Sequence, residues 1–199
     1  MRTRFVLASA SPARLTLLAN AGIVAEVVVS GVDESTVEST DAKTLSLTLA
    51  RLKARTVASR LTNAGPTLVL GCDSVLAMDH EILGKPVDAD EAVRRWRAMR
   101  GRAGVLHTGH CLIGSAETAE AVASTTVHFA EISDAEIDAY VATGEPLRVA
   151  GAFTIDGLGG PFVERIDGDP GTVIGLSLPL LRHLLHELGL RITDLWATH

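Results

Sequence analysis

Short apolar runs along the chain alternate with longer stretches in which apolar residues recur every three or four positions. The short runs are typical of buried strands, and the longer period is typical of helices that bury one face. Strands are predicted at residues 4–8, 67–70, 106–114 and 124–132. Four helices are predicted to begin after residues whose side chains can cap an N-terminus, namely Ser11, Asp88, Ser133 and Ser177, and a further helix is predicted to begin at Asp41. We therefore predict an α/β or α+β fold, built as one domain over residues 1–199 without a linker.

Two of these elements carry much of the candidate chemistry. The helix predicted over residues 41–61 has an apolar side made of Leu45, Leu49, Leu52 and Val57, and its other side bears Lys43, Arg51, Lys53, Arg55 and Arg60. The strand at 67–70 runs into Gly71-Cys72-Asp73-Ser74, which predicts that it ends there in a polar corner. Two later helix starts have the spacing of a capping box, Asp88 with Glu91 and Ser133 with Glu136.

Composition and charge narrow the function classes. The chain has 199 residues, of which 47% are apolar, and a net charge of −6. An acidic surface disfavours nucleic acid and anionic membranes as partners, because binding to them relies on basic residues. Arg2 and Arg4 precede an apolar run that breaks at Ser9, too soon for a signal peptide, and two cysteines cannot form a disulfide framework. We therefore expect a cytoplasmic protein that binds neither nucleic acid nor membrane.

Several common motifs are excluded. Gly84-Lys85 is followed by Pro86, so it is not a phosphate-binding loop of the Walker type. The glycine-rich segment 157–161 lacks the last glycine of the dinucleotide pattern and does not open a strand–helix–strand unit. The pairs His107/His110 and His183/His186 have no further ligands at zinc spacing and are expected to be solvated or capping residues.

The remaining polar residues suggest an anion site. Ser9, Ser11 and Arg14 lie where a strand meets a helix N-terminus, which favours an anion, although the same segment is also an ordinary helix start. Asp73 follows a strand, where open α/β sheets place ligands. Taken together, Arg14, Lys53 and Lys85 are candidate phosphate ligands, and Glu34 and Asp73 are candidate metal or base groups. This combination is suited to phosphoanhydride chemistry.

At this point the sequence resembles the Maf family of nucleoside triphosphate pyrophosphatases, also described as septum-formation-inhibitor-like proteins. The matching segments follow one another along nearly the whole chain: residues 7–14, 32–34, 49–54, 71–75, 83–86, 99–102, 108–109, 140–146, 150–157 and 173–176. The resemblance implies a mixed central sheet with flanking helices, two lobes around a cleft, and assembly as a homodimer. It also implies hydrolysis of nucleoside triphosphates to monophosphates and pyrophosphate with a divalent cation, Mg²⁺, Mn²⁺ or Co²⁺.

By matching position, the resemblance assigns roles to the candidate residues. Asp73 is implied to be the proton acceptor, with Lys53 and Lys85 as further catalytic residues. Ser9, Ser11 and Arg14 are implied to bind the phosphates, and Glu34 with Asp73 to hold the metal. The rival hypothesis is a nucleotide-sensing interaction protein that inhibits septum formation and cell division with little catalysis.

Three positions depart from the family pattern and bear on specificity. Ala13 stands where the family usually has an arginine, Ser74 where Thr or Gln usually follows the aspartate, and Asp156 where many members have Gln. These positions differ between the branches that act on uridine or thymidine triphosphates and on methylguanosine triphosphate. Since this chain matches neither branch, the sequence leaves the base preference open.

Overall fold

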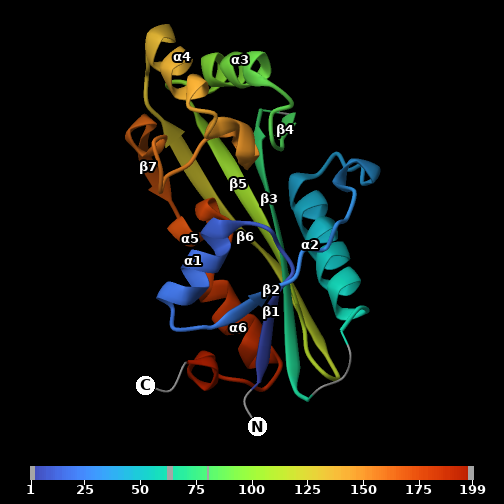
Figure 1. Cartoon of the computed structure of the whole chain (residues 1–199). Coiled ribbons are helices and arrows are strands. Elements are labelled where there is room, and N and C mark those ends of the chain that lie inside the picture. The colour runs from blue at the N-terminus through green and yellow to red at the C-terminus, as the bar shows by residue number, and fades with distance from the viewer. Residues whose placement is uncertain (1–2, 62–64, 80, 197–199) are drawn as a thin grey trace.

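A computed structural model of the protein describes residues 3–61, 65–79 and 81–196, so Arg2 and the outermost ends of the predicted domain lie outside the described residues (Figure 1). The elements are β1 (Arg4–Leu7), α1 (Pro12–Asn20), β2 (Ala25–Val27), α2 (Ala42–Ala58), β3 (Thr67–Met78), β4 (Glu81–Leu83), α3 (Ala89–Met99), β5 (Ala103–Ile113), β6 (Thr118–Phe129), α4 (Asp134–Ala142), β7 (Val163–Asp167), α5 (Pro170–Ile174) and α6 (Leu178–Glu187). No helix in this part of the chain has the length and apolar character needed to cross a membrane.

The helix starts follow the sequence prediction. Ser11, Asp41, Asp88, Ser133 and Ser177 each accept a hydrogen bond from a backbone N–H of the first turn of their helix. Ser133 and Glu136 form the predicted capping box. The box predicted at Asp88 is incomplete, because the Glu91 carboxylate accepts from Val87 N–H, one residue before the cap.

The strands form one mixed sheet in the order β2-β1-β3-β5-β6-β7, with β4 paired to β3, which confirms the predicted fold class. β1 pairs in parallel with β2 and β3, whereas β3, β5, β6 and β7 pair antiparallel. The prediction that a strand ends at Leu70 is wrong, because β3 continues through Gly71–Ser74 to Met78. The strand predicted at 124–132 lies earlier, at Thr118–Phe129. The short elements β2, β4, β7 and α5 were not predicted.

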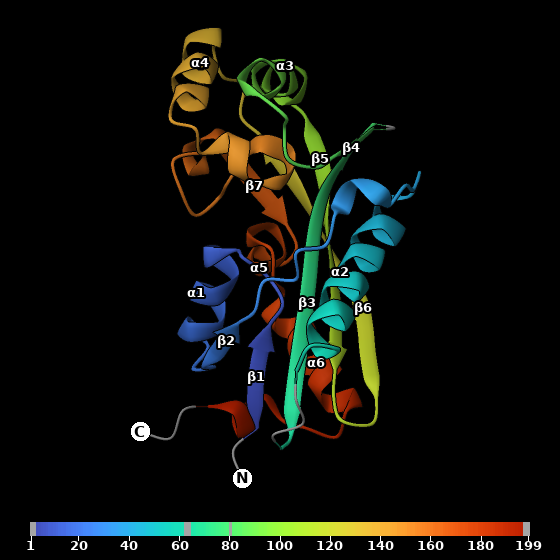
Figure 2. The same ribbon diagram turned by 45° about the vertical axis from the view of Figure 1, so that its right-hand side comes forward.

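Helices lie at both ends of the long strands β3, β5 and β6, with α1 and α6 towards one end and α3 and α4 at the other (Figure 2), and a separate apolar core lies at each end. One core lies among β1, α1 and α6 and includes Leu18, Leu70 and Leu184. The other lies beneath α3 and α4 and is built around Trp96, which packs edge-on against Phe129, Tyr140 and Phe162.

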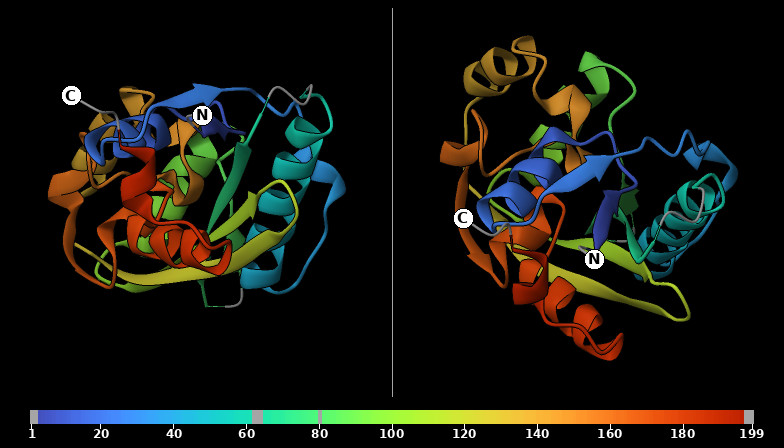
Figure 3. Two further views of the ribbon diagram at one scale, coloured as in Figure 1. Left: turned by 90° about the horizontal axis from the view of Figure 1, so that it is seen from below. Right: turned by 60° about the horizontal axis from the view of Figure 1, so that its bottom comes forward.

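Alternate residues of β3 face opposite sides of the sheet. Leu70 and Cys72 belong to the core that contains α6, whereas α2 covers the other face (Figure 3). Two glycines allow α2 to approach closely. A Cβ at Gly71 would lie 2.3 Å from the Ala50 carbonyl oxygen, and one at Gly109 would lie 2.4 Å from that of Ser46. The helix therefore rests directly on the backbone of β3 and β5.

The edge of β3 is open in the middle. β1 pairs with β3 only as far as Leu70, and β4 pairs with it only from Leu76 onward. Residues 71–75 therefore have a strand neighbour on one side alone, in β5. The opening lies at the carboxyl end of β1, where its parallel pairing with β3 stops, and α/β sheets place ligands at such ends.

Candidate active site

A cleft of about 960 Å³ opens at this gap in the sheet edge. Segments from both ends of the molecule line it. All of the residues singled out from the sequence are among them: Ser9, Ser11, Ala13, Arg14, Glu34, Lys53, Asp73, Ser74, Lys85 and Asp156. The structure thus brings the set together, although this placement leaves the role of each residue a prediction.

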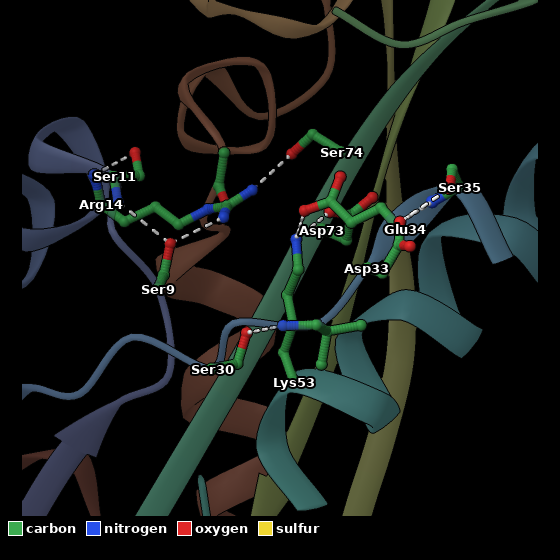
Figure 4. A network of polar contacts seen from close by, with 12 residues as sticks. Ser9, Ser11, Arg14, Ser30, Asp33, Glu34, Ser35, Lys53, Asp73 and Ser74 are labelled. Carbon is green, nitrogen blue, oxygen red and sulfur yellow. Dashed lines mark hydrogen bonds and ion pairs between the residues drawn. The ribbon is translucent and has the colours of Figure 1, made fainter. Parts of the chain in front are cut away.

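At the centre of the cleft, one ammonium group lies between two carboxylates (Figure 4). Lys53 Nζ lies 2.5 Å from Asp73 Oδ1 and 2.6 Å from Glu34 Oε1. Lys53 and Asp73 are buried, at 8% and 6% exposure, whereas the Glu34 side chain is 49% exposed. The prediction that Lys53 lies on the outer side of its helix is wrong. The close approach of α2 to the sheet directs its side chain inward.

The surroundings of Asp73 act on its ionisation in opposite directions. Burial raises the pKa of this carboxyl group, while the Lys53 ammonium and the Arg14 guanidinium favour its charged form. The balance leaves the pKa of Asp73 above its ordinary value. A carboxylate with a raised pKa is a stronger base than a solvated one, which suits proton abstraction near neutral pH.

Arg14 forms the second polar centre of the cleft. It is 8% exposed and donates to Ser9 Oγ at 3.1 Å, Ser74 Oγ at 3.1 Å and the Gly175 carbonyl at 2.7 Å. These three acceptors are uncharged, so the positive charge of the guanidinium is not neutralised by them. An arginine has five N–H donors, and this one keeps donors for a further anion.

Three serine hydroxyls have defined hydrogen-bonding roles around Arg14. Ser11 Oγ accepts from Arg14 N–H at 3.4 Å as the cap of α1, and Ser9 Oγ accepts from Ser11 N–H at 3.2 Å. Ser74 Oγ lies 2.8 Å from Thr108 Oγ1, whose single proton goes to the Thr172 carbonyl at 2.8 Å. Ser74 must therefore donate to Thr108 while it accepts from Arg14, which leaves it no proton for a ligand.

Thr108 was given no role from the sequence, and the expectation for the histidines beside it was only partly correct. Thr108 is fully buried and fixes Ser74, although it carried a signal in the sequence as part of the family match at 108–109. His107 and His110 are buried, not solvated, at 7% and 0% exposure. His110 Nδ1 donates to the Thr108 carbonyl at 3.0 Å, and Ser177 N–H donates to Nε2 at 2.9 Å. A buried polar ring is stable here because both of its nitrogens are paired.

The opposite wall of the cleft carries more exposed charges. Lys85 is exposed in a turn that is held from behind, since Arg95 Nη1 and Gly151 N–H donate to the Gly84 carbonyl at 2.6 and 3.0 Å. Arg148 and Asp156 also line this wall and are exposed. Arg148 was not singled out from the sequence, where nothing distinguished it from a surface arginine.

The carboxylate oxygens in the cleft suit a hard divalent cation that takes its remaining ligands from a substrate. Glu34 and Asp73 both pair with the Lys53 ammonium, so the two carboxylates lie close to each other. Among residues 3–61, 65–79 and 81–196, no group of three or more His, Cys, Asp or Glu converges as a metal site. Mg²⁺ is commonly held by one or two carboxylates plus substrate phosphates, which fits this set.

The arrangement therefore combines an anion-binding wall with a buried carboxylate. Arg14 and Lys53 supply positive charge inside the cleft, and Lys85 and Arg148 supply it at the opposite wall. Asp73 lines the same cleft, paired with Lys53, and can accept a proton. Such a site can bind a polyanion and activate a water molecule against it.

Comparison with known proteins agrees with the resemblance seen in the sequence. A family model described as "Maf-like protein" matches residues 4–188. A protein of Salinispora tropica named nucleoside triphosphate pyrophosphatase is 67% identical over 98% of this chain and 88% of its own length. Relatives of the same name from Streptomyces coelicolor and Trichormus variabilis are 59% and 53% identical, over 98% of this chain and 96% and 98% of their own lengths. The chain is a member of the Maf family.

Proposed function

We propose that this protein hydrolyses nucleoside triphosphates to nucleoside monophosphates and pyrophosphate, and so removes non-standard nucleotides. The observation that carries the proposal is the buried pair of Lys53 and Asp73 beside Arg14 in one cleft. Relatives that share more than half of its residues over nearly their whole lengths are named for this activity. Cleavage between the α- and β-phosphorus requires positive charge along the triphosphate and a base for the attacking water, and the cleft contains both.

Each residue has a role in this reaction that follows from its position. Arg14 and Lys85 hold the triphosphate from opposite walls, and Ser9 and Ser11 bind phosphate oxygens at the start of α1. Lys53 holds the Asp73 carboxylate in place and stabilises the charge that develops on the departing pyrophosphate. Asp73 takes the proton from water, and its raised pKa makes it effective near neutral pH.

Glu34 and Asp73 are the residues that would hold a divalent cation, Mg²⁺, Mn²⁺ or Co²⁺. When bound, the cation supplies further neutralisation of the phosphate oxygens and lowers the cost of bringing a polyanion to two carboxylates. The exposure of Glu34 leaves its carboxylate accessible from solvent.

Specificity for the nucleoside is assigned to Ala13, Ser74 and Asp156, which line the same cleft. Ala13 offers no charge. Ser74 offers an oxygen whose own proton is already donated to Thr108. Asp156 offers a hydrogen-bond acceptor. This set favours contacts to N–H or O–H donors of the nucleoside over contacts to further anionic groups.

The location and assembly follow from the same proposal. Its substrates belong to the cytoplasm, and two free buried cysteines suit that reducing compartment. We place the protein there as a homodimer. Val24, Val27, Val29 and Trp196 are exposed apolar residues, and contact with a second copy would remove such side chains from water. Light scattering of the purified protein tests the dimer.

The direct test of function is pyrophosphate release from about twenty natural and modified nucleoside triphosphates with Mg²⁺, Mn²⁺ or Co²⁺. We expect turnover of at least one of them. Asp73→Asn should lower its kcat by at least about a hundredfold while nucleotide binding persists. Asp138→Asn, an exposed change on α4, is the matched control.

Two results would contradict the proposal. Tight nucleotide binding without release of pyrophosphate from any member of the panel would favour the nucleotide-sensing alternative. A kcat for Asp73→Asn within a fewfold of the unmodified protein would remove Asp73 as the base.

A further inference from the structure

The glycine-rich segment at 157–161 has a function that the sequence patterns did not suggest. Its backbone wraps around a carboxylate of the protein itself, that of Glu145. Glu145 Oε2 accepts from Leu158 N–H at 3.0 Å, and Oε1 accepts from Gly159 N–H at 3.0 Å. Oε1 also accepts from the hydroxyls of Thr154 at 2.6 Å and Tyr140 at 2.9 Å.

The glycines are needed for this close packing. A Cβ at Gly157 would lie 2.7 Å from Glu145 Oε2, and one at Gly159 would lie 2.4 Å from the Tyr140 hydroxyl oxygen. Glycine-rich backbone that cradles phosphate in other proteins therefore cradles an internal anion in this one. The four donors to Glu145 are all uncharged. Burial opposes ionisation of Glu145, but hydrogen bonds from Thr154, Leu158, Tyr140 and Gly159 outweigh it and lower the pKa of this carboxyl group.

The segment held by Glu145 also forms part of the cleft wall. Thr154 and Asp156 line the cleft, whereas Glu145 and Tyr140 lie behind it. Asp156 lies between two points of attachment, because Glu145 binds Thr154 before it and Leu158 and Gly159 after it. The position of the exposed Asp156 in the cleft thus depends on a carboxylate that does not itself reach the cleft.

A second attachment holds the chain at Ala152, two residues before Thr154. Ala152 has φ of 60°, a conformation that residues other than glycine rarely adopt. The Trp96 indole N–H donates to its carbonyl at 2.8 Å, and Ala152 is fully buried. Strained backbone held by its surroundings is typical of segments that position functional groups.

We propose that Glu145 is a positioning residue for nucleoside recognition, whose carboxylate sets Thr154 and Asp156 at the cleft wall. The inference rests on the proposed function. The Thr154 hydroxyl proton is used for Glu145, so Thr154 presents only an oxygen acceptor to the cleft, as Asp156 does. The wall that Glu145 fixes therefore takes hydrogen-bond donors of the nucleoside, either base N–H groups or ribose hydroxyls.

Two variants that leave the cleft lining intact test this role. Glu145→Gln keeps the size of the side chain but turns an amide NH₂ toward Leu158 N–H or toward the hydroxyl donors. Tyr140→Phe removes one donor to Glu145 and folds even if Glu145→Gln does not, since the phenyl ring keeps the apolar contacts. Glu164→Gln, on the exposed β7 strand, is the matched control.

Steady-state kinetics of pyrophosphate release should show a split between KM and kcat. For Glu145→Gln, we expect KM for the best nucleotide to rise about tenfold, while kcat stays within about threefold of that of the unmodified protein. A tenfold rise in KM corresponds in free energy to the loss of roughly one charge-assisted hydrogen bond. Discrimination between the best nucleotide and its competitors should shrink, and Tyr140→Phe should change both quantities less in the same direction. Deoxyribose and dideoxyribose substrates separate the two sources of donors. If the cleft wall binds ribose hydroxyls, the KM effect of Glu145→Gln disappears with these substrates. If it binds base N–H groups, the effect remains.

A readout independent of turnover is amide hydrogen exchange. Leu158 and Gly159 should exchange faster in Glu145→Gln, with β3 and β5 unchanged. Faster exchange there together with unmodified KM and discrimination would overturn the inference, as would a fall in kcat at constant KM. If the unmodified protein releases no pyrophosphate, the proposed function fails and the inference falls with it. An active protein with unaltered variants refutes the inference alone.

Discussion

Acid is expected to destabilise this protein through one buried histidine. His110 is fully buried on β5, and its Nε2 must be unprotonated because it accepts from Ser177 N–H. Protonation would place a cation away from water and abolish that hydrogen bond. Burial, aided by the nearby Arg14 guanidinium, lowers the pKa of His110 from 6.5 to about 4.

The direction and size of the effect follow from this shift. Between pH 6.5 and about 4 the unfolded chain carries the His110 proton and the folded protein does not. The free energy of unfolding therefore contains the full His110 contribution above pH 6.5 and loses it as the pH falls toward 4. A drop in the pKa of His110 from 6.5 to about 4 corresponds to about 3 kcal/mol, a large share of the stability of a typical domain.

Urea denaturation at a series of pH values measures this contribution. His110→Gln retains an acceptor for Ser177 N–H but cannot titrate, so it is less stable near neutral pH and less sensitive to acid. From about pH 7 to about pH 4.5, the stability gap between the two proteins should narrow by about 2 kcal/mol, because carboxylate titration is common to both. Parallel stability curves over this range would refute the reasoning.

Two further predictions concern the cleft. Gly109→Ala should push α2 from the sheet, because its Cβ would lie 2.4 Å from the Ser46 carbonyl oxygen, and cost about 1–3 kcal/mol in urea denaturation. It should also lower kcat, because the displaced α2 would withdraw Lys53 from Asp73. Gly114→Ala is the control: its Cβ would lie 3.4 Å from the nearest atom, so it should change neither stability nor kcat. Glu34→Gln should weaken Mn²⁺ binding, followed by the paramagnetic resonance of the free ion, by about tenfold or more. Unchanged Mn²⁺ affinity would remove Glu34 from the cation site.

Local chemistry explains which parts of the fold were predictable. The helix starts were correct because a capping side chain and its backbone donor lie within three residues of each other, as at Ser133 and Glu136. The short strands β2 and β4, of three residues each, leave too little pattern to recognise. The burial of His110 depends on Ser177, which is 67 residues away and cannot be inferred from the neighbours of either residue.

The site was predictable in composition but not in arrangement. Residue chemistry alone indicated the phosphate-binding, catalytic and metal-binding candidates, and the family resemblance added Ala13, Ser74 and Asp156. Nothing in the spacing placed them in one cleft. Lys53 was assigned to the side of its helix opposite the apolar residues, whereas α2 rests on two glycines close enough to the sheet to bury it.

The error at Gly71–Ser74 has the same origin as the site. These residues look like the end of a strand because a glycine and two polar side chains interrupt an apolar run. β3 nevertheless continues through them, along the cleft. Gly71 admits α2, which delivers Lys53 to Asp73 on one face, while Ser74 meets Arg14 on the other. The β3 edge is open at this stretch, so polar side chains can be tolerated in a central strand. Polar residues that interrupt the apolar pattern of a strand whose backbone nevertheless continues are therefore themselves a signal of function.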